Sequence, residues 1–439
     1  MSAPAERDGL AGATAREGWR ALLAGGGSGG HVFPALAVGE ELAARGWRVD
    51  FTGAAAGMEA RLVGERGLPF HPLPALPFVG RGLADRLRAL WTLVRSTFAA
   101  RRLIRGLGIA VVVGTGGYVS APAVLGAALA GRPSLLLEPN AVPGTANRWL
   151  SRWASDAALA FDACAGRLHC GGAVTGVPVR AEFAALPDEP PRREPLRVLV
   201  AGGSQGAEQL NRLVPAALGR LAADGRLPAL SVFHQAGRGK VESTEEAYRA
   251  AGIALRGPTG RAATGETAGG RSDAAATAGP AGSAVSQETA SGRTGDAAAG
   301  GPAEPGPDVT VADFVADMAS EVGAAHLVVS RAGAITAAEI CNAGRASLLV
   351  PLTLAGGHQA DNARTLEQAG AALVLPSTGL TGEALGEALG ALLADRGRLA
   401  AMGRAARAMA RPDAAAAIAD RVERLAAREA GSRAGKETA

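Results

Sequence analysis

The chain has 439 residues, a formal net charge of +4 and 48% hydrophobic residues. This length suits two domains of roughly 200 residues, each with its own core. The net charge of +4 says little about nucleic acid, but no zinc-finger or single-strand stacking motif occurs, and no nucleic-acid partner is expected. Three cysteines (Cys164, Cys170 and Cys341) have no metal-type spacing and fit a reducing cytoplasm. Glycines and Pro122 interrupt the longest uncharged window, residues 106–131, which excludes a membrane-spanning helix there.

Apolar runs alternate with helical patterns in the first half of the chain. Residues 1–18 lack the apolar segment of a signal peptide and are predicted to be a disordered extension. A first domain over residues 19–180 is predicted to contain strands and helices in alternation, including a helix from Pro34 to Arg45. The expected strands are 21–23, 47–52, 109–113, 134–137 and 157–161. Residues 174–180 should cross to a second domain, followed by a proline-rich linker at 187–195.

The second half repeats the alternation over residues 195–411. The expected strands are 197–200, 230–233, 309–311, 327–329, 347–350 and 371–375. This pattern predicts an α/β fold with parallel sheets. A final helix over 412–430 is expected to pack back on the first domain. Residues 258–308 have Val285 as their one large aliphatic side chain and no aromatic, so they cannot offset the entropy of ordering and are predicted to be a disordered insertion.

Two glycine-rich turns, residues 24–30 and 201–206, each lie between a predicted strand and a predicted helix. A turn of this kind presents backbone N–H groups at the positive end of a helix dipole and binds phosphate. Ligands of parallel sheets bind at the carboxyl ends of the strands. The two turns therefore predict two Rossmann-like domains that face each other across a ligand-binding cleft.

The first turn permits two interpretations. Gly25, Gly27 and Gly30 match the dinucleotide fingerprint, and Asp50 stands where a ribose-binding acid would follow, as in an NAD-dependent oxidoreductase. His31 favours a different chemistry, because a histidine in the first turn of a helix has a lowered pKa and can act as a neutral general base. A histidine that merely forms hydrogen bonds within the loop is the simpler alternative.

Four motifs in the same order make the chain similar to the MurG family of bacterial glycosyltransferases. They are Gly-Gly-Ser-Gly-Gly-His-Val-Phe-Pro-Ala-Leu-Ala at 26–37, Gly-Gly-Tyr-Val-Ser at 116–120, Gly-Gly-Ser-Gln-Gly at 202–206 and Arg-Ala-Gly-Ala-Ile-Thr-Ala-Ala-Glu at 331–339. The resemblance covers nearly all of residues 19–430. It implies a GT-B architecture, in which the first Rossmann-like domain holds the acceptor and the second holds the nucleotide sugar.

The resemblance also implies an activity. N-acetylglucosamine would be moved from UDP-N-acetylglucosamine (UDP-GlcNAc) to the 4-hydroxyl of lipid I, the undecaprenyl-diphosphate-linked muramoyl-pentapeptide, to give lipid II for peptidoglycan synthesis, cell shape and cell division. Val315 would contact uracil through its backbone, Glu339 the ribose hydroxyls and Gln359 the sugar hydroxyls. The full set of implied donor contacts is Ser28, Gly29, Gly30, Asn140, Arg180, Ser204, Val315, Ala334, Ile335, Thr336, Ala337, Ala338, Glu339 and Gln359.

The expected mechanism is inverting and needs neither a metal nor another cofactor. No Asp-x-Asp pair occurs in the chain, so a divalent ion would lack its usual ligands on the diphosphate. Helix N-termini and Arg180 would stabilise the leaving UDP. His31 is the first candidate for the base and Glu138 the second. Glu138 lies in Leu137-Glu138-Pro139-Asn140, where the family usually has His-Glu-Gln-Asn.

A lipid acceptor implies a peripheral enzyme on the cytoplasmic side of the cell membrane. Segment 76–105 offers a membrane-facing surface, because it mixes large apolar side chains such as Trp91 and Phe98 with seven arginines, including Arg86, Arg88 and Arg95. An ordinary core helix with an arginine-rich outer face is the alternative interpretation.

Three other functions remain as alternatives. The nearest is another GT-B enzyme that uses a UDP-sugar, such as an epimerase or an antibiotic glycosyltransferase. An NAD-dependent oxidoreductase is more distant. A sugar-nucleotide-binding regulator would keep Glu339 but would have no use for His31.

Overall fold

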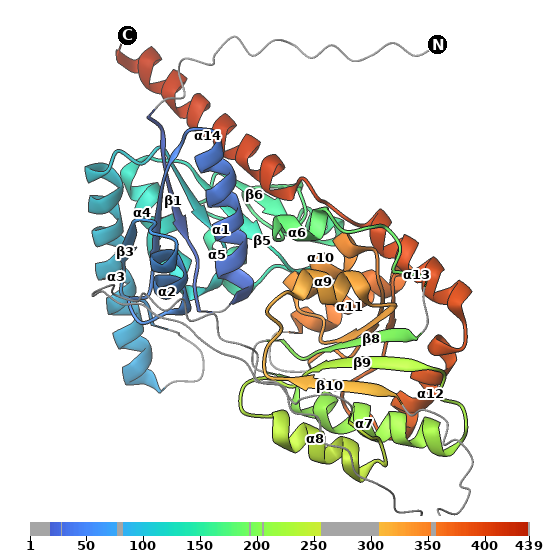
Figure 1. Ribbon diagram of the computed structural model, residues 1–439. Coiled ribbons are helices and arrows are strands. Elements are labelled where there is room, and N and C mark those ends of the chain that lie inside the picture. The colour runs from blue at the N-terminus through green and yellow to red at the C-terminus, as the bar shows by residue number, and fades with distance from the viewer. Residues whose placement is uncertain are drawn as a thin grey trace, which may run out of the picture.

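The computed structural model describes residues 18–27, 29–76, 82–192, 195–203, 206–255, 307–352 and 357–437. Two parallel sheets form two bodies, and the C-terminal helix runs from the second body along the first (Figure 1). The first sheet has seven strands in the order β3-β2-β1-β4-β5-β6-β7, and the second has six in the order β10-β9-β8-β11-β12-β13. The predicted fold class, two Rossmann-like α/β domains, is confirmed.

The strands follow the buried apolar runs closely. The first sheet contains β1 (Arg20–Ala24), β2 (Arg48–Gly53), β3 (Phe70–Pro72), β4 (Val111–Gly114), β5 (Ser134–Glu138), β6 (Asp156–Leu159) and β7 (Ala173–Val174). The second contains β8 (Leu196–Ala201), β9 (Leu230–Gln235), β10 (Asp308–Ala312), β11 (Leu327–Ser330), β12 (Ala346–Leu349) and β13 (Ala372–Val374).

Helices cover both faces of each sheet (Figure 1). Those of the first half are α1 (Gly29–Ala44), α2 (Met58–Glu65), α3 (Leu83–Gly106), α4 (Gly117–Ala130), α5 (Thr145–Leu150), the 3₁₀ turn η1 (Asp162–Cys164) and α6 (Ala181–Ala184). Those of the second half are α7 (Glu208–Ala223), α8 (Val241–Ala250), α9 (Met318–Ala324), α10 (Ala334–Ala343), α11 (His358–Gln368), α12 (Gly382–Leu393), α13 (Arg396–Ala408) and α14 (Ala414–Glu437).

Several element boundaries differ from the prediction. The edge strand β3 was not predicted, since it has three residues and ends in Pro72, which an edge position tolerates. Helix α1 begins at Gly29, within the glycine turn, instead of at Pro34. The predicted extension at 1–18 lies outside the described residues apart from Gly18, and the insertion at 258–308 apart from residues 307–308. Asp308 is the first residue of β10, so this strand begins one residue earlier than expected.

The C-terminal helix α14 completes the core of the first sheet. Ile418, Ala419 and Val422 are fully buried against the β1 and α1 side of that sheet. Arg45, the residue directly after α1, donates hydrogen bonds to Asp420 and to the carbonyl of Ala416. The chain thus returns from the second domain to cover an apolar face of the first.

No helix in the described ranges combines the length and apolarity needed to span a bilayer. Helix α3 is nevertheless unusual for a water-facing helix, because it exposes large apolar side chains. Exposed positions at helical spacing form one face of α3, here called the α3 apolar stripe: Leu87, Leu90, Trp91, Val94 and Phe98. Ala89, Ala100 and Ile104 are buried and hold the helix to the domain.

Candidate active site

A pocket of about 290 Å³ lies between the two domains at the carboxyl ends of both sheets. Gly29, Gly30 and Phe33 line it from the start of α1, and residues 178–180 line it from the crossing between the domains. The second domain contributes Gly203, Gln235, Phe314, Val315, Met318, Gly333, Ala334, Ile335, Thr336 and Glu339. This is the position at which parallel α/β sheets bind ligands.

Two helix N-termini open into this pocket. Helix α1 begins at Gly29, and α10 begins at Ala334 after Gly333, whose N-cap position has no side-chain hydrogen bond. An uncapped N-terminus leaves backbone N–H groups free for an anion. One helix from each domain therefore presents positive partial charge to the same space, an arrangement suited to a diphosphate.

His31 has a fixed tautomer. Its Nδ1 lies 2.7 Å from the carbonyl of Thr115, which can only accept, so Nδ1 carries the proton and Nε2 keeps its lone pair. The Thr115 hydroxyl donates back to the carbonyl of His31 at 2.8 Å. Burial lowers the pKa of His31, against smaller raising effects of the Thr115 hydrogen bond and the Glu138 charge. The expected direction is right, but burial is the leading cause and not the helix dipole.

The carboxylate of Glu138 is fully occupied by its own loop. Its Oε1 accepts from the backbone and side-chain nitrogens of Asn140, both at 3.0 Å. Its Oε2 accepts from the backbone of Gly144 and from the Asn147 side chain, both at 2.9 Å. Each oxygen therefore already accepts two hydrogen bonds, so Glu138 shapes the loop 139–144 and has no lone pair left for a substrate proton.

Arg180 and Glu339 form an ion pair in the wall of the pocket. Arg180 Nη2 lies 3.2 Å from Glu339 Oε1, and the Arg180 guanidinium also stacks on Phe183 with 5.1 Å to the ring centre. The Glu339 side chain is 13% exposed. Burial raises the pKa of Glu339 to about 7, although the charge of Arg180 opposes the shift. A group that changes charge near neutral pH thus lies in the pocket wall.

Several of the remaining residues that the resemblance implies as donor contacts line two different cavities. Val315 is buried beside the exposed Phe314, and both line the pocket. Ala337 and Ala338 line a different cavity, which Cys341 and Asn342 of α10 also border. The Ala337 N–H already donates to Gly333, so only the first turn of α10 has free N–H groups. Of the expected run, Ala334, Ile335, Thr336 and Glu339 line the interdomain pocket.

Two further implied residues form hydrogen bonds inside the protein. Gln359 Oε1 accepts from the backbone of Leu352 at 3.0 Å and orders the start of α11. Asn140 bonds to Glu138 and to Asn362 of the second domain. Ser28 and Ser204 lie outside the described residues. Sequence reasoning missed Thr115, Asn147 and Asn362, because their partners are remote in the chain or are backbone groups.

Asp50 is buried within the sheet and is not accessible to a nicotinamide ribose. It is 1% exposed, accepts from Arg20 Nη2 at 3.2 Å, and lies 2.8 Å from His71 Nε2. Asp50 therefore ties β2 to its neighbours, which removes the residue that supported the oxidoreductase alternative. Among the described residues, no group of three or more His, Cys, Asp or Glu side chains is placed to hold a metal ion.

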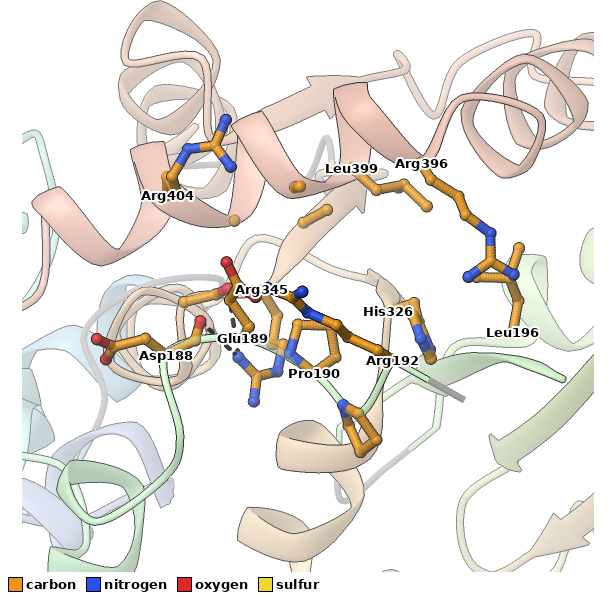
Figure 2. A pocket seen from close by; sticks show the side chains of 15 residues that line it. Asp188, Glu189, Pro190, Arg192, Leu196, His326, Arg345, Arg396, Leu399 and Arg404 are labelled. Atoms are coloured by element: carbon orange, nitrogen blue, oxygen red, sulfur yellow. Dashed lines mark hydrogen bonds and ion pairs between the residues drawn. The ribbon is translucent and has the colours of Figure 1, made fainter. Parts of the chain in front are cut away.

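A second cavity, of about 470 Å³, lies at the opposite, amino-terminal edge of the second sheet (Figure 2). Its wall contains Leu196 at the start of β8 and Arg396 at the start of α13. The α13 N-terminus is capped by Asp395, and Asp188 in the cavity wall pairs with Arg407. This cavity offers neither an open helix N-terminus nor a glycine turn, so the interdomain pocket is the better candidate.

Fold and site together define a two-domain glycosyltransferase of the GT-B class. Models of the glycosyltransferase family 28 N-terminal and C-terminal domains match residues 21–159 and residues 197–256 and 287–418. The chain belongs to glycosyltransferase family 28, in its MurG branch.

Curated relatives support this membership over most of the chain. One from Acidithiobacillus ferrooxidans is 39% identical over 403 residues, covering 91% of this chain and 95% of the relative. One from Stutzerimonas stutzeri is 39% identical over 402 residues, with 91% and 96% covered. Both are named UDP-N-acetylglucosamine–N-acetylmuramyl-(pentapeptide) pyrophosphoryl-undecaprenol N-acetylglucosamine transferase.

Solved structures agree. The crystal structure of Acinetobacter baumannii MurG is 30% identical, with a TM-score of 0.69 and coverage of 92% of this chain and 99% of that one. The calicheamicin glycosyltransferase CalG4, at 18% identity and a TM-score of 0.58, shares the fold.

Proposed function

We propose that this chain transfers N-acetylglucosamine from UDP-GlcNAc to the 4-hydroxyl of the muramoyl sugar of lipid I. The observation that carries the proposal is the interdomain pocket, into which one uncapped helix from the second domain and one glycine turn from the first both open. His31, with a free Nε2, directly follows the glycines that line it. The names of the curated relatives supply the identity of donor and acceptor.

In this proposal the second domain holds the donor, and the interdomain pocket is the donor pocket. The free N–H groups of Ala334, Ile335 and Thr336 bind the diphosphate. Glu339 accepts from both ribose hydroxyls, since a carboxylate has enough lone pairs for two donors. The backbone of Val315 contacts uracil, and Gly29 and Gly30 approach the diphosphate from the first domain.

Arg180 exchanges partners when the donor binds. Arg180 pairs with Glu339 at 3.2 Å, and both residues line the same pocket. A diphosphate offers Arg180 a stronger, doubly charged partner, and the ribose then takes up the released carboxylate. Arg180 is thereby placed to stabilise the negative charge that develops on the leaving UDP.

His31 is the base. The acceptor 4-hydroxyl attacks the anomeric carbon in line, the bond from that carbon to the diphosphate oxygen breaks, and His31 Nε2 takes the hydroxyl proton. The configuration inverts and a β-1,4 linkage forms. Because its oxygens are occupied, Glu138 acts on this step at a distance: its charge opposes the lowering of the His31 pKa by burial.

A membrane surface on the first domain brings the enzyme to its lipid acceptor. The α3 apolar stripe is solvent-exposed, with Trp91 at 69% and Leu87 at 60% exposure. Arg86, Arg88 and Arg95 are exposed on the same helix. Aromatic and apolar side chains flanked by arginines suit an anionic bilayer surface, which supports a peripheral location on the cytoplasmic face.

A transfer assay tests the activity. Purified protein is incubated with radiolabelled UDP-GlcNAc and a short-chain lipid I analogue, and we expect a labelled disaccharide product that a β-hexosaminidase cleaves. Conversion of UDP-GlcNAc to an epimer without acceptor would identify an epimerase instead. Absence of any acceptor-dependent product would refute the proposal.

A further inference from the structure

We infer that Asn362 is a positioning residue that holds the His31 side of the active site in register with the donor side. The inference rests on the proposed function, because it assigns a role within that reaction. Asn362 lies on α11, has no exposed surface and does not line the donor pocket. It therefore acts through its neighbours and not on the substrate.

Asn362 uses its amide to join three segments. Its Oδ1 accepts from the backbone N–H of Ala141 at 2.8 Å. Its Nδ2 donates to Asn140 Oδ1 and to the carbonyl of Ala332, both at 3.2 Å. Asn140 and Ala141 belong to the loop after β5 in the first domain, whereas Ala332 lies in the turn that starts α10. One fully buried side chain thus connects the two domains at the active site.

Each connected segment carries a part of the reaction. The loop 139–144 is fixed on its other side by Glu138, whose charge acts on His31. The turn that contains Ala332 leads directly to Gly333 and the uncapped start of α10. Movement of this turn relative to the loop would shift the diphosphate relative to the base. Asn362 opposes that movement from both sides.

The same network gives Asn140 a role that differs from the direct donor contact implied by the resemblance. Its Oδ1 accepts from Asn362, and its Nδ2 donates to Glu138 at 3.0 Å. Asn140 is therefore the link between the Glu138 cluster and the second domain. In this assignment Asn140 and Asn362 act as one unit across 222 residues of chain.

The test measures catalysis and donor affinity separately. Asn362→Asp keeps the side-chain volume and the acceptor for Ala141 but removes both donated hydrogen bonds. We expect kcat to fall about 10²-fold, the effect of a displacement of roughly 1 Å in an active site, while the Kd for UDP stays close to that of the wild type. Asn140→Ala breaks the bridge from its partly exposed side and should behave in the same way.

A double-mutant cycle separates a shared role from two independent ones. If the residues act as one unit, the double variant Asn140→Ala with Asn362→Asp loses no more kcat than either single variant. Asn342→Ala is the matched control, since Asn342 is also a buried asparagine of the second domain but bonds within its own helix to Ala338. It should leave kcat unchanged.

Three outcomes would overturn the inference. They are wild-type kcat in the folded Asn362→Asp protein, equal losses of kcat and UDP affinity in either variant, or additive losses in the cycle. Should Asn362→Asp not fold, the same kcat and Kd measurements on Asn140→Ala decide the question alone. If the wild-type protein had no transferase activity, the proposed function itself would be refuted. The wild-type Kd for UDP would then show separately whether the protein still binds the nucleotide.

Discussion

The imidazole of His31 is available as a base because the carbonyl of Thr115 determines which nitrogen carries the proton. We expect His31→Ala to lower kcat by about 10²-fold or more, the usual contribution of a general base. Its Kd for UDP should change little, since His31 does not line the donor pocket. Single-turnover kinetics and calorimetry with UDP measure the two quantities.

A second histidine serves as the control. His71 bonds to Asp50 on the far strands of the first sheet, and His71→Ala should leave kcat unchanged. If His31→Ala weakened UDP binding and kept kcat, the base would have to be another group. The pH profile adds a check: burial lowers the pKa of His31, so kcat should fall on the acid side only below the ordinary histidine value of about 6.5.

Glu339 gives donor binding its own pH dependence. Burial raises its pKa to about 7, so the carboxyl is largely protonated below that pH and ionised above it. Ribose hydroxyls donate best to the ionised form, so the Kd for UDP should rise as pH falls through about 7. Binding near neutral pH should also release protons, which calorimetry in buffers of different ionisation enthalpy detects.

Glu339→Gln provides the comparison, because a carboxamide does not titrate. Its Kd for UDP should be weaker than that of the wild type by about tenfold or more, given about 1.5–3 kcal/mol for a charge-assisted hydrogen bond, and independent of pH. A wild-type Kd that stayed constant between pH 5.5 and 8, values chosen to bracket the Glu339 pKa of about 7, would contradict this assignment.

At the scale of elements, the exposed arginines of α3 should control membrane binding. Replacement of Arg86, Arg88 and Arg95 by glutamate should weaken binding to anionic liposomes by roughly 1 kcal/mol for each lost basic contact. UDP affinity should be unaffected, because α3 does not line the donor pocket. Co-sedimentation with vesicles of graded anionic lipid content measures the effect.

The control is a triple variant with the same change of net charge, placed on the second domain. Arg238, Arg398 and Arg404 are exposed, and their replacement by glutamate should leave liposome binding as in the wild type. If both triple variants bound equally well, the α3 arginines would have no special role. If both lost binding equally, net charge and not the α3 surface would be responsible.

Local patterns predicted the elements that build the pocket. The glycine turns and the strands before them are encoded in contiguous residues, so spacing identifies them. The start of α1 at Gly29 was expected only at Pro34, and the start of α10 at Ala334 came from the family resemblance. Asn362 could not be found in this way, since its partners lie 221 and 222 residues away. Nor could the sequence reveal that Arg180 pairs with Glu339, because that contact depends on how the two domains meet.

At the scale of the whole molecule, α14 makes the stability of the first domain depend on the end of the chain. Ile418 and Val422 are fully buried among β-strand and α1 side chains of the first sheet. The segment before α14 also touches the crossing between the domains: a Cβ at Gly176 would lie 2.4 Å from Arg411 Cβ, so the two connecting chains run in direct contact. The two chain segments that connect the domains, one at Gly176 and one at Arg411, therefore pack against each other.

We therefore expect Ile418→Ala to destabilise the protein by about 2–5 kcal/mol, the usual cost of a cavity at a buried isoleucine. Leu90→Ala removes a similar side chain that is 50% exposed on α3, and it should change stability by no more than about 0.5 kcal/mol. Chemical denaturation followed by circular dichroism measures both variants against the wild type. Equal midpoints for Ile418→Ala and the wild type would mean that α14 contributes nothing to the first domain in solution. Loss of the Ile418 side chain should also leave the Kd for UDP unchanged under native conditions, because the donor pocket is lined by other elements.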